Sequence, residues 1–251
     1  MRALMLLCAA SVAPTVHADT VLSFDTTDAG AASTVQLVDG AVRIDGGESG
    51  EWMLYKADED TLFIISPTDR SYTRVDEAGI RKLGGQMDAA RAEWEAEMAK
   101  LPPEQRAMAE QMMQRMTGGR TLKKTAPPEP QATGSSQSVA GVKCENYVVE
   151  QRGAKETLCV AAPDDLGMSD EEYETVQAMY ALLAKLSEAT GFAGSAAPRA
   201  DKLPGVPVLI DSQGGERKRN QRLTGVKHPE LRSSVFALPS GYAERDPSDL
   251  K

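Results

Sequence analysis

The side chains with the most distinctive chemistry in this sequence are methionine thioethers. Met108, Met112 and Met116 recur every four residues, which on an α-helix places them within about 80° of one another. Soft thioethers on one face can bind Cu(I), and flexible methionine surfaces also suit adaptable apolar partners. The same spacing fits a helix that packs on a core or at an interface. The pattern therefore leaves three interpretations open: packing, apolar binding and metal binding.

The cysteines form the second candidate group. Cys8 lies in the apolar start of the chain, which leaves Cys144 and Cys159. Both lie in strand-like runs, 142–150 and 155–161, that flank Gly153. An antiparallel hairpin there places the two cysteines opposite each other within about one residue of register, so we predict a disulfide. The other interpretation, a redox-active pair, usually requires cysteines two residues apart at the start of a helix.

The sequence contains few of the residues that an enzyme or a nucleic-acid-binding protein typically uses. It has 2 His, and 28 Lys and Arg against 37 Asp and Glu give a net charge of −9. His228 precedes Pro229 without any accompanying nucleophile, phosphate-loop, dinucleotide or zinc motif. An excess of acidic residues disfavours a phosphate backbone as partner. We therefore expect a protein without catalytic activity, cofactor or nucleic-acid partner.

The first residues predict export. Arg2, a short apolar run and Val16-His17-Ala18 match the three regions of a cleaved signal peptide. We expect residues 1–18 to be removed and the protein to reside in the periplasm. No later run has 18 uncharged apolar residues, so we expect no membrane-spanning segment. Residues 19–251 are expected to form a single domain.

The first part of that domain reads as a strand meander from Thr20 to Val75. Asp39-Gly40 between alternating runs is a strong hairpin signal. A second predicted hairpin, 52–57 and 61–66, is apolar on both faces, and a strand of that kind requires cover on both. Helices, another sheet or a ligand would provide it. The candidate ligand-binding residues on this hairpin are Trp52, Leu54, Phe63 and Ile65.

The rest of the chain alternates between helices and strands. Apolar residues spaced three and four apart predict a helical hairpin inserted at about 76–119, broken by Pro102-Pro103. Residues from about 120 to 140, rich in Pro, Gly and Ser, predict a flexible linker. Ser169 and Glu172 form a capping box that opens another helix. Strands are expected at 206–212, 216–226 and 233–238, which together make an α+β, mainly antiparallel fold.

One cluster of basic residues stands out in this acidic chain. Arg217, Lys218, Arg219 and Arg222 lie close together. They suit anionic lipid head groups, and they also suit an edge strand protected against aggregation.

Several of these segments resemble a family of exported bacterial domains allied to the LolA/LolB lipoprotein-localisation factors. The resemblance rests on 55–65, Ser71-Tyr72-Thr73-Arg74, 139–144 and 236–242. It implies a curved antiparallel sheet, a half-barrel, wrapped around helices with an apolar cavity that carriers use for acyl chains. The expected function is therefore non-catalytic binding of an apolar or amphipathic ligand, a lipid or a lipidated chain. The alternatives are Cu(I) binding and a protein-interaction module, both through the Met-rich helices.

Overall fold

The computed structural model describes residues 18–26, 32–46, 50–116, 128–151, 154–190, 199–213 and 220–247. In these ranges the chain is α+β, with one large sheet and three α-helices. The first strands are β1 (Thr20–Thr26), β2 (Ala32–Val38), β3 (Ala41–Asp45), β4 (Trp52–Lys56), β5 (Thr61–Ser66) and β6 (Ser71–Val75). The later strands are β7 (Gln131–Val139), β8 (Val142–Gln151), β9 (Ala154–Ala161), β10 (Val206–Gln213), β11 (Asn220–Lys227) and β12 (Ala243–Arg245).

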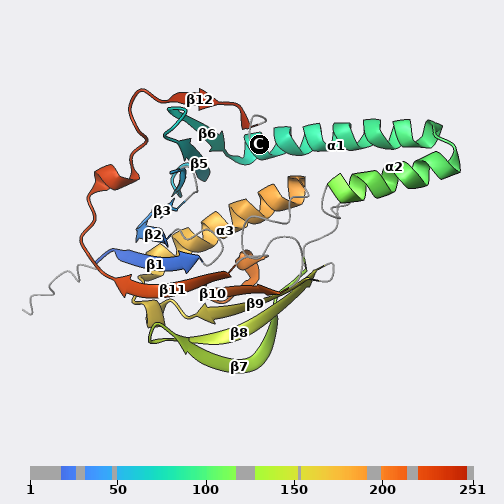
Figure 1. Cartoon of the computed structure of the whole chain (residues 1–251). Coiled ribbons are helices and arrows are strands. Elements are labelled where there is room, and N and C mark those ends of the chain that lie inside the picture. The colour runs from blue at the N-terminus through green and yellow to red at the C-terminus, as the bar shows by residue number, and fades with distance from the viewer. Residues whose placement is uncertain are drawn as a thin grey trace, which may run out of the picture.

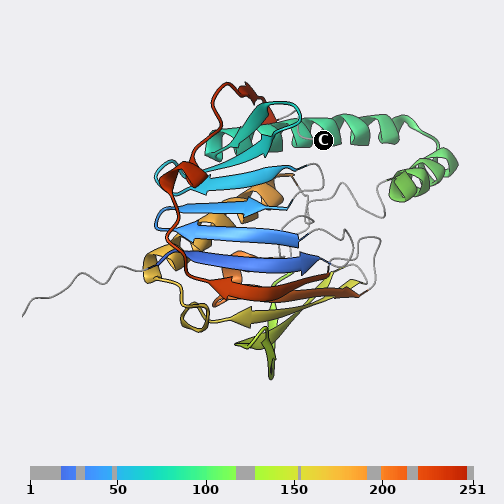
Figure 2. The same ribbon diagram turned by 60° about the vertical axis from the view of Figure 1, so that its left-hand side comes forward.

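The strands follow the order β12-β6-β5-β4-β3-β2-β1-β11-β10-β9-β8-β7. Every neighbouring pair is antiparallel except β12 and β6, which run parallel. The sheet curves, and α3 (Asp170–Thr190) lies against its inner face (Figures 1 and 2). The predicted α+β class and the mainly antiparallel sheet are thus confirmed.

Short turns set the register of the meander. Val38 pairs with Ala41 around Asp39-Gly40, and Gly40 has φ +81°, which favours glycine. Between β4 and β5 the corresponding position is Asp60 with φ +40°. The sequence predicted both hairpins correctly because the residues at the turns suit these backbone conformations.

The start of α3 is fixed by the predicted capping box. The Glu172 amide donates to Ser169 Oγ (3.0 Å), and the Ser169 amide donates to Glu172 Oε2 (2.9 Å). Thr20 of β1 adds two bonds, because its amide donates to Glu172 Oε1 (2.8 Å) and its hydroxyl to Oε2 (2.9 Å). The buried Glu172 carboxylate therefore ties α3 to the first residues of β1.

The inserted helices are α1 (Glu77–Lys100) and α2 (Pro103–Met116). α1 continues through Gly84, where a Cβ would lie 3.1 Å from the Ala189 Cβ of α3. The close approach of these helices explains a small residue at this position. Beyond it, α1 and α2 extend away from the sheet (Figures 1 and 2). None of the helices in the described ranges combines the length and apolarity that a bilayer crossing requires.

Two segments differ from the sequence predictions. Residues 131–139, the second half of the predicted linker, form β7, while 117–127 lie outside the described residues. Residues 233–238, predicted as a strand, contain a 3₁₀ turn at Ser233–Phe236. Both segments owe their conformation to the sheet that they contact, which local composition does not encode.

Candidate functional site

A row of partly exposed apolar side chains crosses the inner face of the sheet. Val35, Ile44, Met53 and Ile64 lie on β2, β3, β4 and β5 and are directly paired in register. Each is partly buried against the core that contains α3. Because neighbouring strands lie about 4.8 Å apart, these four side chains span about 14 Å. The arrangement forms a continuous apolar line across the sheet.

The neighbouring row on the same face is completely buried. It consists of Leu37, Val42, Tyr55, Leu62 and Val75, all in the core with α3 residues Val176, Met179 and Leu182. The Tyr55 hydroxyl donates to Asp60 Oδ1 (2.9 Å) at the edge of this row. Burial, and then the nearby Asp60 carboxylate, raise the pKa of Tyr55, so the phenol stays protonated. α3 therefore covers one row fully and leaves the next row partly accessible.

On its other side the exposed row is bordered by polar residues: two serines and, two residues before Met53, the exposed Glu51. Ser33 of β2 and Ser66 of β5 come two residues along their strands from Val35 and Ile64, so they share the inner face. Both serines are partly exposed. The inner face thus changes from buried apolar to accessible apolar to polar, which is the profile that an amphipathic molecule matches.

The sequence prediction did not include this row. Met53 and Ile64 were recognised as part of a hairpin with two apolar faces, but the candidate residues were chosen from the opposite face. The sequence did contain a signal for this row, because Val35 and Leu37, and likewise Val42 and Ile44, alternate with polar residues. It becomes visible once the register across four strands is known.

The predicted ligand-binding residues of the second hairpin lie on the outer face. Trp52, Leu54, Phe63 and Ile65 are buried, Leu54 and Ile65 completely. They form a core with Phe236, and Leu231, Val235, Leu238 and Tyr242 pack against it. We call residues 231–247 the C-terminal strap. The cover that these side chains require is provided by the chain itself.

Specific contacts hold the strap in place. Arg43 stacks over the Trp52 ring (3.9 Å from its centroid) and donates to the Val235 carbonyl (2.9 Å). Asp45 accepts from the same guanidinium (2.7 Å), and the Leu231 amide donates to Asp19 Oδ2 (2.6 Å). The outer face is consequently closed along the strands that were predicted to bind ligand.

The methionines of α2 are placed differently. Met108 and Met112 are 66% and 65% exposed and are the exposed large apolar residues among those described. The side chain of Met116 lies outside the described residues. Packing on the body of the protein, one of the interpretations left open by the sequence, does not apply to Met108 and Met112. Their thioethers remain accessible to a partner or a soft metal ion.

The predicted disulfide is present. Cys144 and Cys159 are bonded, with their Cα atoms 5.4 Å apart. The predicted register needs correction, because Cys159 is opposite Asn146. The bond joins diagonal positions, two residues apart in register, and the strand twist brings them close. Both cysteines are buried, at 3% and 0% exposure, which fits a structural bond.

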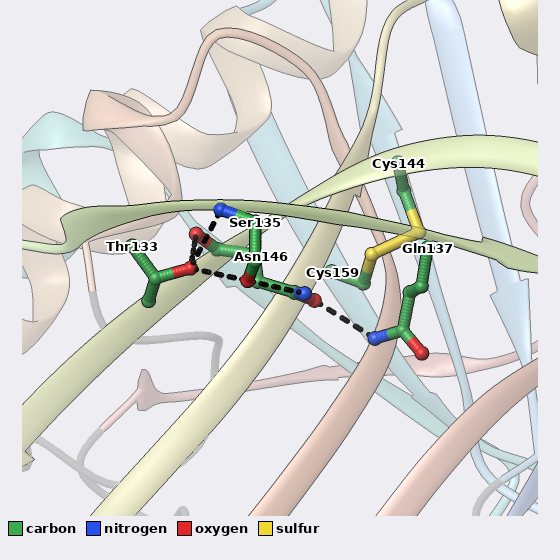
Figure 3. The surroundings of a disulfide bond; sticks show 6 residues. All are labelled: Thr133, Ser135, Gln137, Cys144, Asn146 and Cys159. Carbon is green, nitrogen blue, oxygen red and sulfur yellow. Dashed lines mark hydrogen bonds between the residues drawn. A yellow bond between two sulfur atoms is a disulfide. The ribbon is translucent and has the colours of Figure 1, made fainter.

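Beside the disulfide, polar side chains fasten a bulge in β7. The register of β7 on β8 shifts between Ala132 and Ser136, and all of the intervening residues face Asn146. Asn146 Nδ2 donates to Ser135 Oγ (3.0 Å), Gln137 Nε2 donates to Asn146 Oδ1 (2.8 Å), and Thr133 Oγ1 donates to the Asn146 carbonyl (3.0 Å) (Figure 3). These bonds hold the extra residues against the sheet.

His228 and the basic cluster are the other groups that the sequence singled out. His228 lies with its ring against Gly167, where a Cβ would lie 2.8 Å from Nε2. Within the described ranges, no three His, Cys, Asp or Glu side chains are arranged to hold a metal ion. Of the basic cluster, Arg222 is exposed on β11, and Arg217, Lys218 and Arg219 lie outside the described residues.

Known proteins resemble this chain in structure but not in sequence. No family model and no curated protein matches the sequence. Solved structures that are similar include PNGF-II in a C2 crystal form (10% identity, TM-score 0.44) and in a P21 form (8%, 0.45). Each match covers 91% of this chain and 31% or 32% of PNGF-II, so the chain spans about a third of that protein. An uncharacterized conserved protein from Thermus thermophilus is similar over 92% of this chain and 91% of its own (7%, 0.43).

Proposed function

We propose that this protein binds an apolar or amphipathic ligand, a lipid or a lipidated chain, without catalysing a reaction on it. The observation that carries the proposal is the registered row Val35, Ile44, Met53 and Ile64, left partly accessible beside α3. An extended acyl chain lying along this row would remove four apolar side chains from water. The polar border at Ser33 and Ser66 would keep a head group at the margin.

The energetics are adequate for reversible binding. Burying the remaining accessible part of each side chain contributes about 1 kcal/mol at roughly 25 cal/mol per Å². Four such side chains contribute about 4 kcal/mol, to which the burial of the ligand itself adds. A ligand that fits is therefore held mainly by apolar contact.

We also propose that the protein works in the periplasm after removal of residues 1–18. The buried Cys144–Cys159 bond suits an oxidising compartment. The LolA/LolB-like architecture remains part of this proposal. It is supported by a curved, mainly antiparallel sheet with a helix on its inner face.

The test measures ligand uptake by the folded protein. Native mass spectrometry and lipid extraction of protein purified from its own envelope are expected to show a bound apolar species. A fluorescent fatty acid is expected to bind about tenfold or more weakly to the Met53→Gln, Ile64→Gln double variant, because about 1 kcal/mol is lost at each position. Val21→Gln is the matched control, since Val21 is partly exposed on the outer face of β1. A wild-type protein without bound lipid and without fatty-acid uptake would refute the proposal.

A second candidate function belongs to α2, and the exposure of Met108 and Met112 favours it. Their thioethers are available to Cu(I) or to an apolar partner protein. Metal binding and partner binding are distinguished by titrating Cu(I) into the wild type and into a variant with Met108, Met112 and Met116 changed to Leu. Equal copper affinities would exclude the metal, and a protein that still co-purifies with the Leu variant would indicate an apolar docking face.

A further inference from the structure

The methionines of this protein differ widely in their access to water. Met108 and Met112 of α2 are 66% and 65% exposed, on a helix that extends away from the sheet (Figures 1 and 2). In contrast, Met98, Met168 and Met179 are 7%, 7% and 3% exposed, and the last two belong to the core around α3. A small reagent dissolved in water therefore reaches the sulfur atoms of Met108 and Met112 but not those of the three shielded methionines.

A thioether that water reaches is a target for two-electron oxidants. With hydrogen peroxide, a lone pair of sulfur attacks one oxygen, and the S–O bond forms as the O–O bond breaks. The hydroxide that leaves takes the proton of the new S–OH group, which gives one sulfoxide and one water. Sulfur loses two electrons and the peroxide gains them. Hypochlorous acid makes the same change and releases chloride and a proton. Both reagents are uncharged, so a net charge of −9 does not keep them away from this chain.

We propose that Met108 and Met112 form a site of reversible oxidation, at which a hydroperoxide or hypochlorous acid converts both thioethers to sulfoxides. The two residues are about one helical turn apart, so both oxygens are added to the same exposed face of α2. A sulfoxide on this face stays in water and displaces no packed side chain. At Met168 or Met179 the same oxygen would lie among apolar core side chains. The proposal rests on the exposure of α2 and is independent of the ligands proposed above.

The exposure of these side chains also makes the modification reversible. A methionine sulfoxide reductase admits the oxidised side chain to its own active site, and two such enzymes act, one on each sulfoxide epimer. A dithiol supplies the two electrons and becomes a disulfide, while the sulfoxide oxygen leaves as water. Met108 and Met112 can enter such an active site while the protein stays folded, because the rest of the described chain leaves them accessible. A sulfoxide in the core would require unfolding first.

The test measures the rate of oxidation at each methionine of the folded, disulfide-bonded protein. Hydrogen peroxide is added, catalase stops the reaction at successive times, and mass spectrometry of peptides locates the sulfoxides. Met108 and Met112 should react about tenfold or more faster than Met98, Met168 and Met179. In urea that unfolds the chain the five rates should become similar, because the fold alone shields the slow residues. Equal rates in the folded protein would overturn the proposal.

A matched variant and a reductase assay complete the test. The Met108→Leu, Met112→Leu variant keeps the helix propensity of α2 and should take up two fewer oxygen atoms than wild type in the fast phase; an unchanged uptake contradicts the assignment. Oxidation of both residues in wild type should shift the midpoint of thermal unfolding by less than about 2 °C, since neither side chain packs on the body. Both reductases, with thioredoxin as the dithiol, should restore the two thioethers in the folded protein. A larger loss of stability, or sulfoxides that the reductases leave in place, overturns the proposal.

Discussion

Removing the Cys144–Cys159 bond is expected to lower the free energy of unfolding by about 3 kcal/mol. The bond closes a loop with a sequence separation of 15. In the chain-entropy model a loop of this length costs the unfolded chain about 10 cal/mol/K, or about 3 kcal/mol at 25 °C. The loss arises in the unfolded state, because the hairpin that contains both residues keeps its backbone pairing.

The assay is urea unfolding of the oxidised wild type and of a Cys144→Ala, Cys159→Ala variant. Alanine avoids placing a hydroxyl at two buried positions. Reduced wild type is the second control, since it lacks the bond but keeps both sulfur atoms. The difference in stability between reduced wild type and the alanine variant measures how much the packing of the sulfur atoms contributes. The urea dependence should also steepen, because a chain without the bond exposes more surface on unfolding.

A loss below about 1 kcal/mol in reduced wild type, with an unchanged urea dependence, would refute this reasoning. It would mean that the unfolded chain already keeps this hairpin closed. A reductant should also act slowly on the native protein, since both cysteines are buried. Fast reduction without unfolding would show that the sheet opens locally at β8 and β9.

Three further outcomes are expected from single substitutions. Asp76→Ala should lower stability by about 1 kcal/mol at neutral pH, because its carboxylate accepts from the Gly79 amide (2.8 Å). That hydrogen bond is the main reason that the pKa of Asp76 is lowered. The stabilisation by the Asp76 carboxylate is therefore complete above about pH 4 and disappears as the pH falls through the lowered pKa. Equal stabilities of wild type and variant in urea at neutral pH would contradict this prediction. Phe236→Ala should cost about 3 to 5 kcal/mol by calorimetry and increase hydrogen exchange in the C-terminal strap, since the side chain is buried in the outer core; unchanged exchange would show that the strap is held by other contacts. Glu172→Gln should cost about 2 kcal/mol in urea unfolding, because its amide nitrogen cannot accept from Thr20 or Ser169, and wild-type stability would show that these bonds are dispensable.

The hairpins and helices were predictable where local chemistry decides them. Asp39-Gly40 and the capping box of Ser169 and Glu172 act over a few residues, and the structure contains both. The disulfide followed from the spacing of two strand-like runs, although its register did not. A twisted pair of strands brings diagonal positions together, and a sequence contains no direct signal for that.

The errors lie where distant segments decide the structure. Residues 131–139 have the composition of a linker, and they are a strand because β8 offers hydrogen bonds and Asn146 anchors the extra residues of the bulge. Trp52 and Phe63 were expected to face a ligand, and they face Phe236. The sequence shows that an apolar face must be covered, but its cover comes from residues more than 150 positions away along the chain.

The order of the sheet has a consequence for how the chain assembles. β1 lies between β2 and β11, and Phe24 is opposite both Ser33 and Leu223. As the chain emerges from its N-terminus, β1 to β6 can pair through the short turns between them, but the second side of β1 has no neighbour until β11 emerges. Joining such remote segments is slow, and an unpaired strand edge invites aggregation in the meantime. Until β11 emerges, one edge of the future central strand therefore stays unpaired. During this interval a chaperone that binds unfolded chains would protect the protein most against aggregation.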